Sequence, residues 1–223
     1  MIPSQYLRSL GVVVFIILAV VWVLPAAAAP VCGESYREPA KGQFLVAARK
    51  MSDPRFEGTV ILLLEHNKKR GTLGVIINKN TDVALTQALP KVPGLAQWKE
   101  TISYGGPVAL NVVIFLSRHS TPLPESGHVL DDVYSSASRV TLAKLFEENQ
   151  DTTTLRLFFG HSGWAAGQLD MELERGDWHL ISADPSQIFA DDRSKLWPQL
   201  IDCASPRGIQ ANLNWSFLEV GAL

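Results

Sequence analysis

The residues whose types and spacing most suggest chemistry lie in one segment, Phe158 to Leu169 (FFGHSGWAAGQL). It places a serine, a histidine and three glycines where an apolar run predicts the end of a strand, a glycine turn and the start of a helix. Such junctions hold phosphates, oxyanions and nucleophiles in many proteins with mixed helices and strands. A nucleophilic serine, a bound anion and a metal ion are the three chemistries to weigh here.

A nucleophile elbow requires a glycine two residues after the serine, so that a helix can pack closely behind a strained turn. Trp164 occupies that position after Ser162, and it is the bulkiest residue available. His161 adjoins Ser162, but successive side chains point to opposite sides of an extended backbone and do not form a dyad by themselves. Hydrolysis by Ser162 and His161 is therefore a secondary hypothesis, and no catalytic residue is predicted.

The residue patterns predict neither a nucleotide-phosphate site nor a metal site. The segment lacks the Lys-Ser/Thr pair of a Walker loop and the G-x-G-x-x-G spacing, although its helix start could still hold a small anion. The acidic residues of the following helix spread around it, which indicates solvation: Asp170, Glu172 and Glu174. Neither H-x-H nor H-x-x-x-H occurs among the five histidines, and no cofactor is predicted: His66, His119, His128, His161 and His179.

Two other segments have unusual composition. Asn78 ends an apolar run, where its side-chain amide can bind neighbouring loops or a ligand. Gly105-Gly106-Pro107 predicts a tight turn with an unusual backbone path. A structural role is the simpler interpretation for both.

Apolar runs and capping residues predict the elements that position these segments. Continuous apolar runs over 58–65 and 71–77 predict strands that are covered on both faces. Shorter runs predict further strands over 44–48, 111–116, 155–159 and 177–183. Capping residues predict helices after Asp82, Ser138 and Asp184. Leu169 and Leu173, four residues apart, mark a helix after Trp164, and a last helix is expected over 192–200. Strands outnumber helices and include hairpins, which predicts an α+β fold.

Bulk composition limits the possible functions. The chain has 223 residues, 47% hydrophobic and 19% charged, which fits one globular domain plus a targeting segment. Its formal net charge is -2, so no basic excess draws it to nucleic acid. We also find no helix-turn-helix with a basic second helix. Nucleic acid is therefore not an expected partner.

The N-terminus has the pattern of a secretory signal peptide. Arg8 precedes an uncharged apolar run from Leu10 to Leu24, and small residues of the A-x-A type follow. Cleavage after Ala28 or Ala29 would remove residues 1–29 and send the mature chain, with 19 basic and 22 acidic residues, to the periplasm or outside the cell. The alternative is an uncleaved membrane anchor, because 20 apolar residues can just span a bilayer.

The mature chain is predicted to comprise an irregular leader, residues 30–41, and one domain, residues 42–223. Its two cysteines are Cys32 and Cys203. Two thiols in an oxidising compartment tend to pair, and so large a loop would stabilise the fold by about 3–5 kcal/mol. The alternative of two unpaired thiols stays open, since the sequence does not fix the distance between them.

Three motifs, in this order, resemble the YqgE/AlgH family: Gly74 to Asn78 (GVIIN), Tyr104 to Val108 (YGGPV) and Gly160 to Leu169 (GHSGWAAGQL), the last followed by Glu172-Leu173 and Trp178. The resemblance covers about 42–200. It implies a mixed, partly barrel-like sheet flanked by helices. The family is labelled as transcriptional regulators, but no reaction is attached to it. His161 stands where an aromatic residue is usual, and family members usually lack a signal peptide.

The leading hypothesis is a non-enzymatic binding or regulatory module exported to the periplasm. The motif segments are expected to line a shared groove for a small ligand or a peptide of a protein partner. The candidate residues are Asn78, Gly105, Gly106, Pro107, Trp164, Gly167 and Gln168. The alternatives are a cytoplasmic transcriptional regulator, as the family label suggests, and the hydrolase described above.

Overall fold

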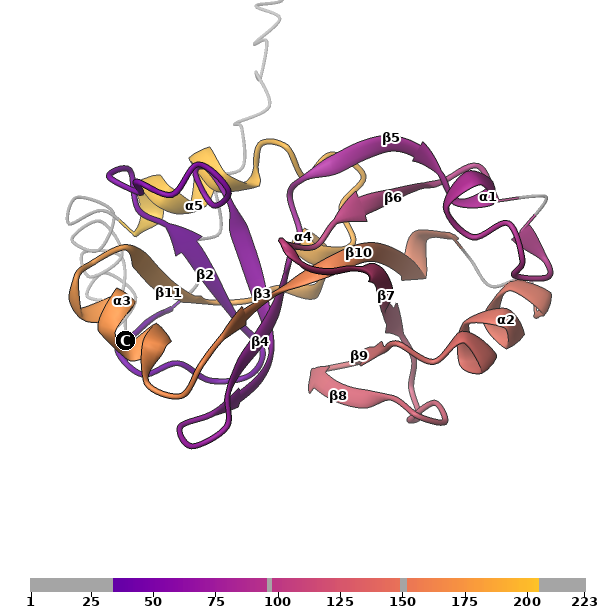
Figure 1. The fold of residues 1–223 in the computed structure, drawn as a ribbon, viewed down its shortest axis with the longest axis horizontal. Coiled ribbons are helices and arrows are strands. Elements are labelled where there is room, and N and C mark those ends of the chain that lie inside the picture. The colour runs from indigo at the N-terminus through magenta and orange to yellow at the C-terminus, as the bar shows by residue number, and fades with distance from the viewer. Residues whose placement is uncertain (1–33, 96–97, 149–151, 205–223) are drawn as a thin grey trace, which may run out of the picture.

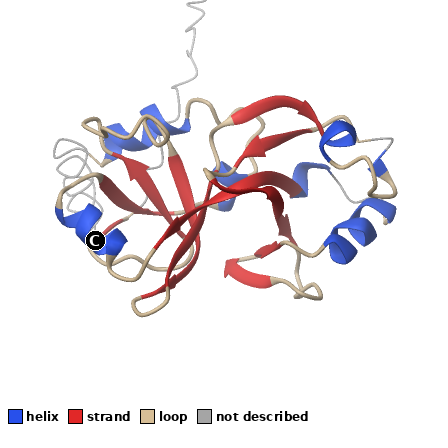
Figure 2. Cartoon of the chain, in the orientation of Figure 1, coloured by secondary structure: helices blue, strands red, loops and turns tan. Residues whose placement is uncertain are grey.

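Strands dominate the chain in the computed structural model, which describes residues 34–95, 98–148 and 152–204 (Figure 1). The strands are β1 (Ser35–Tyr36), β2 (Gln43–Ala47), β3 (Val60–Asn67), β4 (Gly71–Ile76), β5 (Asn80–Ala84), β6 (Thr101–Tyr104), β7 (Val108–Arg118), β8 (Gly127–Leu130), β9 (Val133–Ser136), β10 (Leu155–Trp164) and β11 (Trp178–Ser182). The helices are α1 (Leu85–Ala88), α2 (Arg139–Glu147), α3 (Gln168–Glu174), α4 (Pro185–Ile188), α5 (Leu196–Cys203) and the 3-10 turn η2 (Thr152–Thr154). Figure 2 shows the strands through the middle of the molecule and the helices around them.

One strand, β10, holds two half-sheets together. The first half-sheet has the order β1-β11-β2-β3-β4, and β4 pairs with the C-terminal part of β10. The second half-sheet contains β5, β6, β7, β9 and β8, and both β6 and β7 pair with the N-terminal part of β10. The β6–β10 pair is parallel and β7–β10 is antiparallel, so the sheet is mixed.

The α+β class is confirmed, but the sheet is open. Its path runs from β1 to β8, and these two end strands do not pair with each other in the part of the chain that the structure describes. The barrel-like closure that the resemblance implied is therefore not seen. Two residues of the predicted leader form β1, which pairs with β11 and extends the sheet at that edge.

The first half-sheet is buried on both faces, as its continuous apolar runs predicted. Because side chains alternate along a strand, Leu45 and Ile61 pack with Trp164 on one face. Phe44 and Leu62 point to the other face and belong to the core cluster that includes residues of α4 and α5. Because both faces are buried, apolar and polar residues hardly alternate along β2, β3 and β4.

The second half-sheet has its own core beneath α1 and α2. Leu142, Leu145 and Phe146 of α2 are buried there, and the ring of Phe146 meets Trp98 edge-on with centroids 4.7 Å apart. The predicted N-cap of α2 is confirmed, because Thr141 N donates to Ser138 Oγ over 3.3 Å.

Three local predictions are wrong. The helix expected over 192–200 is α5, which begins only at Leu196 and extends to Cys203. Asp82 does not cap a helix but lies within β5, and α1 begins after Ala84 without a side-chain cap. The strand over 155–159 does not end at a glycine turn either. It bulges at Gly160 and continues as β10 to Trp164, so the next helix, α3, begins only at Gln168.

The predicted signal peptide and the first four residues of the leader, 30–33, lie outside the described residues, and Cys32 is among them. None of the helices within the described ranges is long and apolar enough to cross a bilayer. Cys203 is buried at the end of α5.

The Cys32–Cys203 disulfide remains a prediction. We expect the exported chain, denatured without reductant, to show no thiol that reacts with a maleimide probe, and two after reduction. Detection of two reactive thiols before reduction would contradict the pairing. The bond would contribute about 3–5 kcal/mol to the free energy of unfolding.

Candidate functional site

The Gly105-Gly106-Pro107 segment crosses over β10. Phe158 of β10 has Ser103 of β6 on one side and Ile114 of β7 on the other. The chain that joins β6 to β7 must therefore pass from one edge of β10 to the other. Hydrogen bonds hold this crossing in place, because Gly105 N donates to Phe159 O over 2.9 Å and Ile76 N donates to Gly105 O over 2.8 Å.

Glycine is required where the two segments touch. A Cβ atom on Gly106 would lie 2.4 Å from the carbonyl carbon of His161, and one on Gly160 would lie 2.3 Å from Gly106 O. Both residues also have positive φ angles, 145° and 68°. Gly105, Gly106 and Gly160 thus build the junction of the two half-sheets and present no side chain to a ligand.

Asn78 also has a structural task. Its Oδ1 accepts a 2.8 Å hydrogen bond from Val60 N, and its Nδ2 donates a 2.9 Å bond to Gly58 O. The side chain therefore fixes the start of β3 beside the end of β4. Bonding to neighbouring backbone is one of the two roles that the sequence suggested for this residue.

The remaining predicted residues gather at one cavity. Pro107, Trp164 and Gln168 line a hollow of about 380 Å³, which we call the tryptophan cavity. Gly167 is the N-cap of α3 and directly precedes Gln168, the first residue of the helix. Its φ angle of 75° lets the chain turn there, and no atom lies within 4 Å of its Cβ position. The complete lining is Met51, Ser52, Asp53, Arg55, Phe56, Pro107, Val108, Gly163, Trp164, Gln168, Glu172, Arg175, Asp177 and Trp178.

A carboxylate is held in the wall of the tryptophan cavity by three N–H donors. The indole Nε1 atoms of Trp164 and Trp178 both donate to Glu172 Oε2, over 2.9 Å and 2.8 Å. Gln168 Nε2 donates to Glu172 Oε1 over 3.0 Å, as the i,i+4 spacing on α3 permits. The Glu172 side chain is thereby fixed in one orientation, although the sequence alone indicated a solvated residue.

Aromatic rings support this arrangement from behind. Phe56 stacks on Trp164 at a centroid distance of 6.4 Å and meets Trp178 edge-on at 5.6 Å. Trp164 and Trp178 are only 6% and 3% exposed, so water can hardly replace the bonds of their indole N–H groups to Glu172. The Trp-Glu-Trp contact is therefore a rigid part of the wall.

The other charges of the tryptophan cavity are paired with one another. Arg55 binds Asp53 over 2.6 Å, and Arg175 binds Asp177 over 2.7 Å. The hydrogen bond from Arg55 holds the pKa of Asp53 below its usual value. Among the described residues, the hydrogen-bond donors to Glu172 are all neutral. The cavity thus carries one negative charge without a cation in contact.

A larger cleft adjoins this cavity. It measures about 890 Å³, lies between the β3–β4 hairpin and the β8–β9 hairpin, and shares Val108, Gly163 and Trp164 with the tryptophan cavity. Figure 1 shows the two hairpins side by side below β10. His66, His128 and His161 line the cleft, but the described residues contain no cluster of side chains that could hold a metal ion. Burial lowers the pKa of His161, which favours its neutral form.

Ser162 is not placed as a nucleophile. Its side chain is fully buried, and its hydroxyl donates to Gly105 O over 3.3 Å at the crossing. His161 faces the cleft, while Ser162 points into the junction. This geometry gives no support to hydrolysis by these two residues.

The chain is similar to proteins of one known family. A family profile described as AlgH-like matches residues 44–206. A UPF0301 protein of Mycobacterium avium is 34% identical over 177 residues, covering 75% of this chain and 87% of the relative. A UPF0301 protein of Chlorobium luteolum is 30% identical over 167 residues, covering 74% and 86%.

Two solved structures share the fold. The crystal structure of protein DIP2367 from Corynebacterium diphtheriae superimposes with a TM-score of 0.65 at 26% identity, covering 77% of this chain and 91% of that one. The solution structure of AlgH from Pseudomonas aeruginosa gives a TM-score of 0.62 at 25% identity, covering 78% and 95%. The profile match spans both the glycine crossing and the tryptophan cavity. The chain belongs to the AlgH-like family, to which the UPF0301 proteins are related.

Proposed function

We propose that this AlgH-like protein is an exported binding module that holds a small organic cation in the tryptophan cavity. The observation that carries the proposal is the Glu172 carboxylate, which two indole N–H groups fix in the cavity wall without a cation in contact. A protonated amine or a guanidinium group would supply that charge, and the neighbouring aromatic side chains suit the alkyl part of such a ligand. We assign no reaction to the site.

The fixed geometry favours binding because little conformational entropy is lost when a ligand arrives. The adjoining cleft gives room for a ligand longer than the tryptophan cavity itself. Arg55 and Arg175 are engaged by Asp53 and Asp177 and compete little for Glu172. A linear polyamine or a lysine-containing peptide has the required shape and charge.

Charge removal tests the proposal. Spermidine is titrated into the folded protein while heat and tryptophan fluorescence are recorded. Glu172→Gln is expected to weaken binding at least about tenfold, since a charge-assisted contact is lost. The variant should remain folded, because the amide oxygen can still accept from both indoles.

The matched control is Glu174→Gln, which removes one charge from the exposed side of the same helix, away from the cavity lining. It should bind spermidine like the unmodified chain. Equal weakening in both variants, or no binding at all by the folded protein, would overturn the assignment of the site.

Export is a separate part of the proposal. Residues 1–41 fused to alkaline phosphatase, which folds only in an oxidising compartment, should give active enzyme. Mass spectrometry of the full-length product should find a mature N-terminus at Ala29 or Pro30. An inactive fusion whose polypeptide stays in the cytoplasm would instead favour the intracellular role that the family label suggests.

A further inference from the structure

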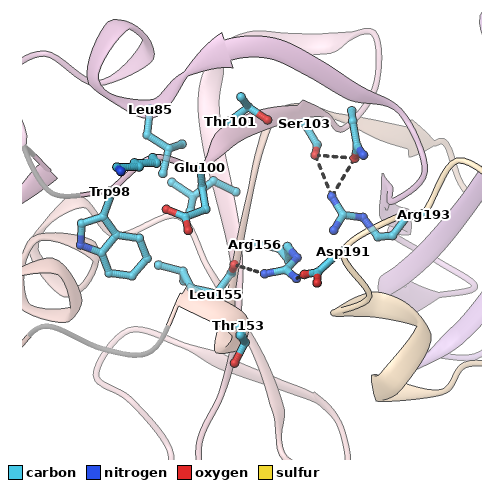
Figure 3. A pocket seen from close by; sticks show the side chains of 13 residues that line it. Leu85, Trp98, Glu100, Thr101, Ser103, Thr153, Leu155, Arg156, Asp191 and Arg193 are labelled. Carbon is cyan, nitrogen blue, oxygen red and sulfur yellow. Dashed lines mark hydrogen bonds and ion pairs between the residues drawn. The ribbon is translucent and has the colours of Figure 1, made fainter.

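A second cavity, on the side of the molecule formed by the second half-sheet, is lined by charged groups that the proposed function does not use. It measures about 280 Å³, and we call it the arginine pocket. Figure 3 shows Arg156 and Arg193 on one side of it and Trp98 and Glu100 on the other. These residues come from β10, from the loop after α4 and from the segment before β6.

Arg193 carries a buried positive charge whose contacts are neutral. It is 5% exposed, and its guanidinium donates to Ile77 O, Ala190 O, Asn80 Oδ1 and Ser103 Oγ, at 2.7 Å to 3.1 Å. These bonds fix its position but supply no opposing charge. Burial, together with a smaller effect of the nearby Arg156, lowers the pKa of Arg193 to about 10. A buried charge normally requires a partner of opposite sign.

Arg156 adds a second positive charge at the same place. Burial lowers the pKa of Arg156, and the carboxylates of Asp191 and Glu100 oppose that shift. Asp191 lies 3.6 Å from Arg156, but the carboxylate side chain is 99% exposed and offsets little of the buried charge. The arginine side of the pocket is therefore suited to an incoming carboxylate.

The opposite side of the pocket contains an acceptor that has no hydrogen-bond donor among the described residues. Glu100 lines the pocket, and its Oε2 atom is buried without a hydrogen-bond partner. An unsatisfied buried carboxylate oxygen is costly, and a protonated amine would satisfy it. Leu85, Trp98 and Leu155 form an apolar wall beside it, which can receive a hydrocarbon side chain.

We propose that the arginine pocket binds a free α-amino acid with an apolar side chain. The carboxylate of the ligand lies toward Arg156 and Arg193, and its ammonium group donates to Glu100 Oε2. The side chain packs on Trp98 and its aliphatic neighbours. A simple anion would match only the arginines and would be repelled by Glu100, whereas a zwitterion matches both sides. This inference is independent of the tryptophan cavity.

The test uses matched ligands. Leucine, methionine and phenylalanine are titrated calorimetrically into the full mature chain at concentrations up to about 10 mM. For leucine the two comparison ligands are 4-methylpentanoate, which lacks the amine, and 3-methylbutylamine, which lacks the carboxylate. We expect at least one of the amino acids to bind, and both truncated ligands to bind about tenfold or more weakly than their parent.

Glu100→Gln removes the charge that would receive the amine and leaves the hydrogen bonds of both arginines in place. It is expected to lower amino-acid affinity about tenfold while leaving the thermal unfolding temperature of the ligand-free protein unchanged or higher. The control is Glu147→Gln, an exposed charge on α2 outside the pocket, which should have no effect. Failure of all three amino acids to bind the folded chain, or equal binding of 4-methylpentanoate and leucine, would overturn the proposal.

Discussion

Gly106→Ala is expected to lower the free energy of unfolding by at least about 3 kcal/mol, or to prevent folding. The added methyl group would lie 2.4 Å from both the carbonyl carbon and the oxygen of His161, and 2.5 Å from Ser162 Oγ. Backbone cannot move away there without breaking the bonds that hold the two half-sheets at β10. Urea unfolding followed by circular dichroism measures the effect.

Gly167→Ala is the matched control, because it also places alanine at a positive φ angle. Nothing lies within 4 Å of the Cβ position at Gly167, so only the backbone preference is changed. Its expected cost is about 1–2 kcal/mol. Equal losses for the two variants would contradict the explanation that close contact at the crossing, and not backbone conformation alone, requires Gly106.

Glu172→Ala is expected to destabilise the protein by about 2–4 kcal/mol. The substitution leaves the indole N–H groups of Trp164 and Trp178 without their acceptor, and each unsatisfied buried donor costs about 1–3 kcal/mol. It also frees Gln168 on the same helix. The urea midpoint should fall, and the tryptophan fluorescence of the folded state should change because both indoles lose a charged neighbour.

Two companion variants separate the hydrogen bonds from the charge. Glu174→Ala, on the exposed side of α3, should change the free energy of unfolding by no more than about 0.5 kcal/mol. Glu172→Gln should retain most of the stability because it still offers an oxygen to both indoles. A Glu172→Ala variant as stable as the unmodified protein would show that the Trp-Glu-Trp contact is not formed in solution.

Features that depend on neighbours in sequence were predictable. The runs over 58–65 and 71–77 indicated strands buried on both faces, and the structure confirms this for β3 and β4. Ser138 and Asp184 were identified as caps because an N-cap bonds to a backbone N–H two or three residues away. The family motifs also identified the segments that meet around β10.

Features that depend on residues far apart in sequence were not predictable in the same way. The apolar run ending at Phe159 looked like a complete strand, because nothing local shows that β4 and β7 continue to pair beyond Gly160. Asp82 has the chemistry of a cap, yet pairing of β5 with β6 determines its conformation.

The candidate sites show the same limit. Glu172 looked solvated because its indole partners approach from strands on either side of α3 in the sequence. The i,i+4 spacing of Gln168 and Glu172, with a tryptophan before and after them in the sequence, could have indicated this contact. The same spacing occurs on many helices without such a contact. Arg193 bonds to Ile77 and Ser103, 116 and 90 residues away, so no local pattern could have indicated the arginine pocket.

The most direct test of the proposed cation site is an NMR titration that follows the indole N–H signals of Trp164 and Trp178. These signals can be assigned among the six tryptophans with single Trp→Phe variants. Addition of spermidine is predicted to shift both signals to saturation in the unmodified protein, with the shifts lost in Glu172→Gln. If both signals stay in place while the protein is folded, or move equally in Glu172→Gln, the tryptophan cavity is not the binding site.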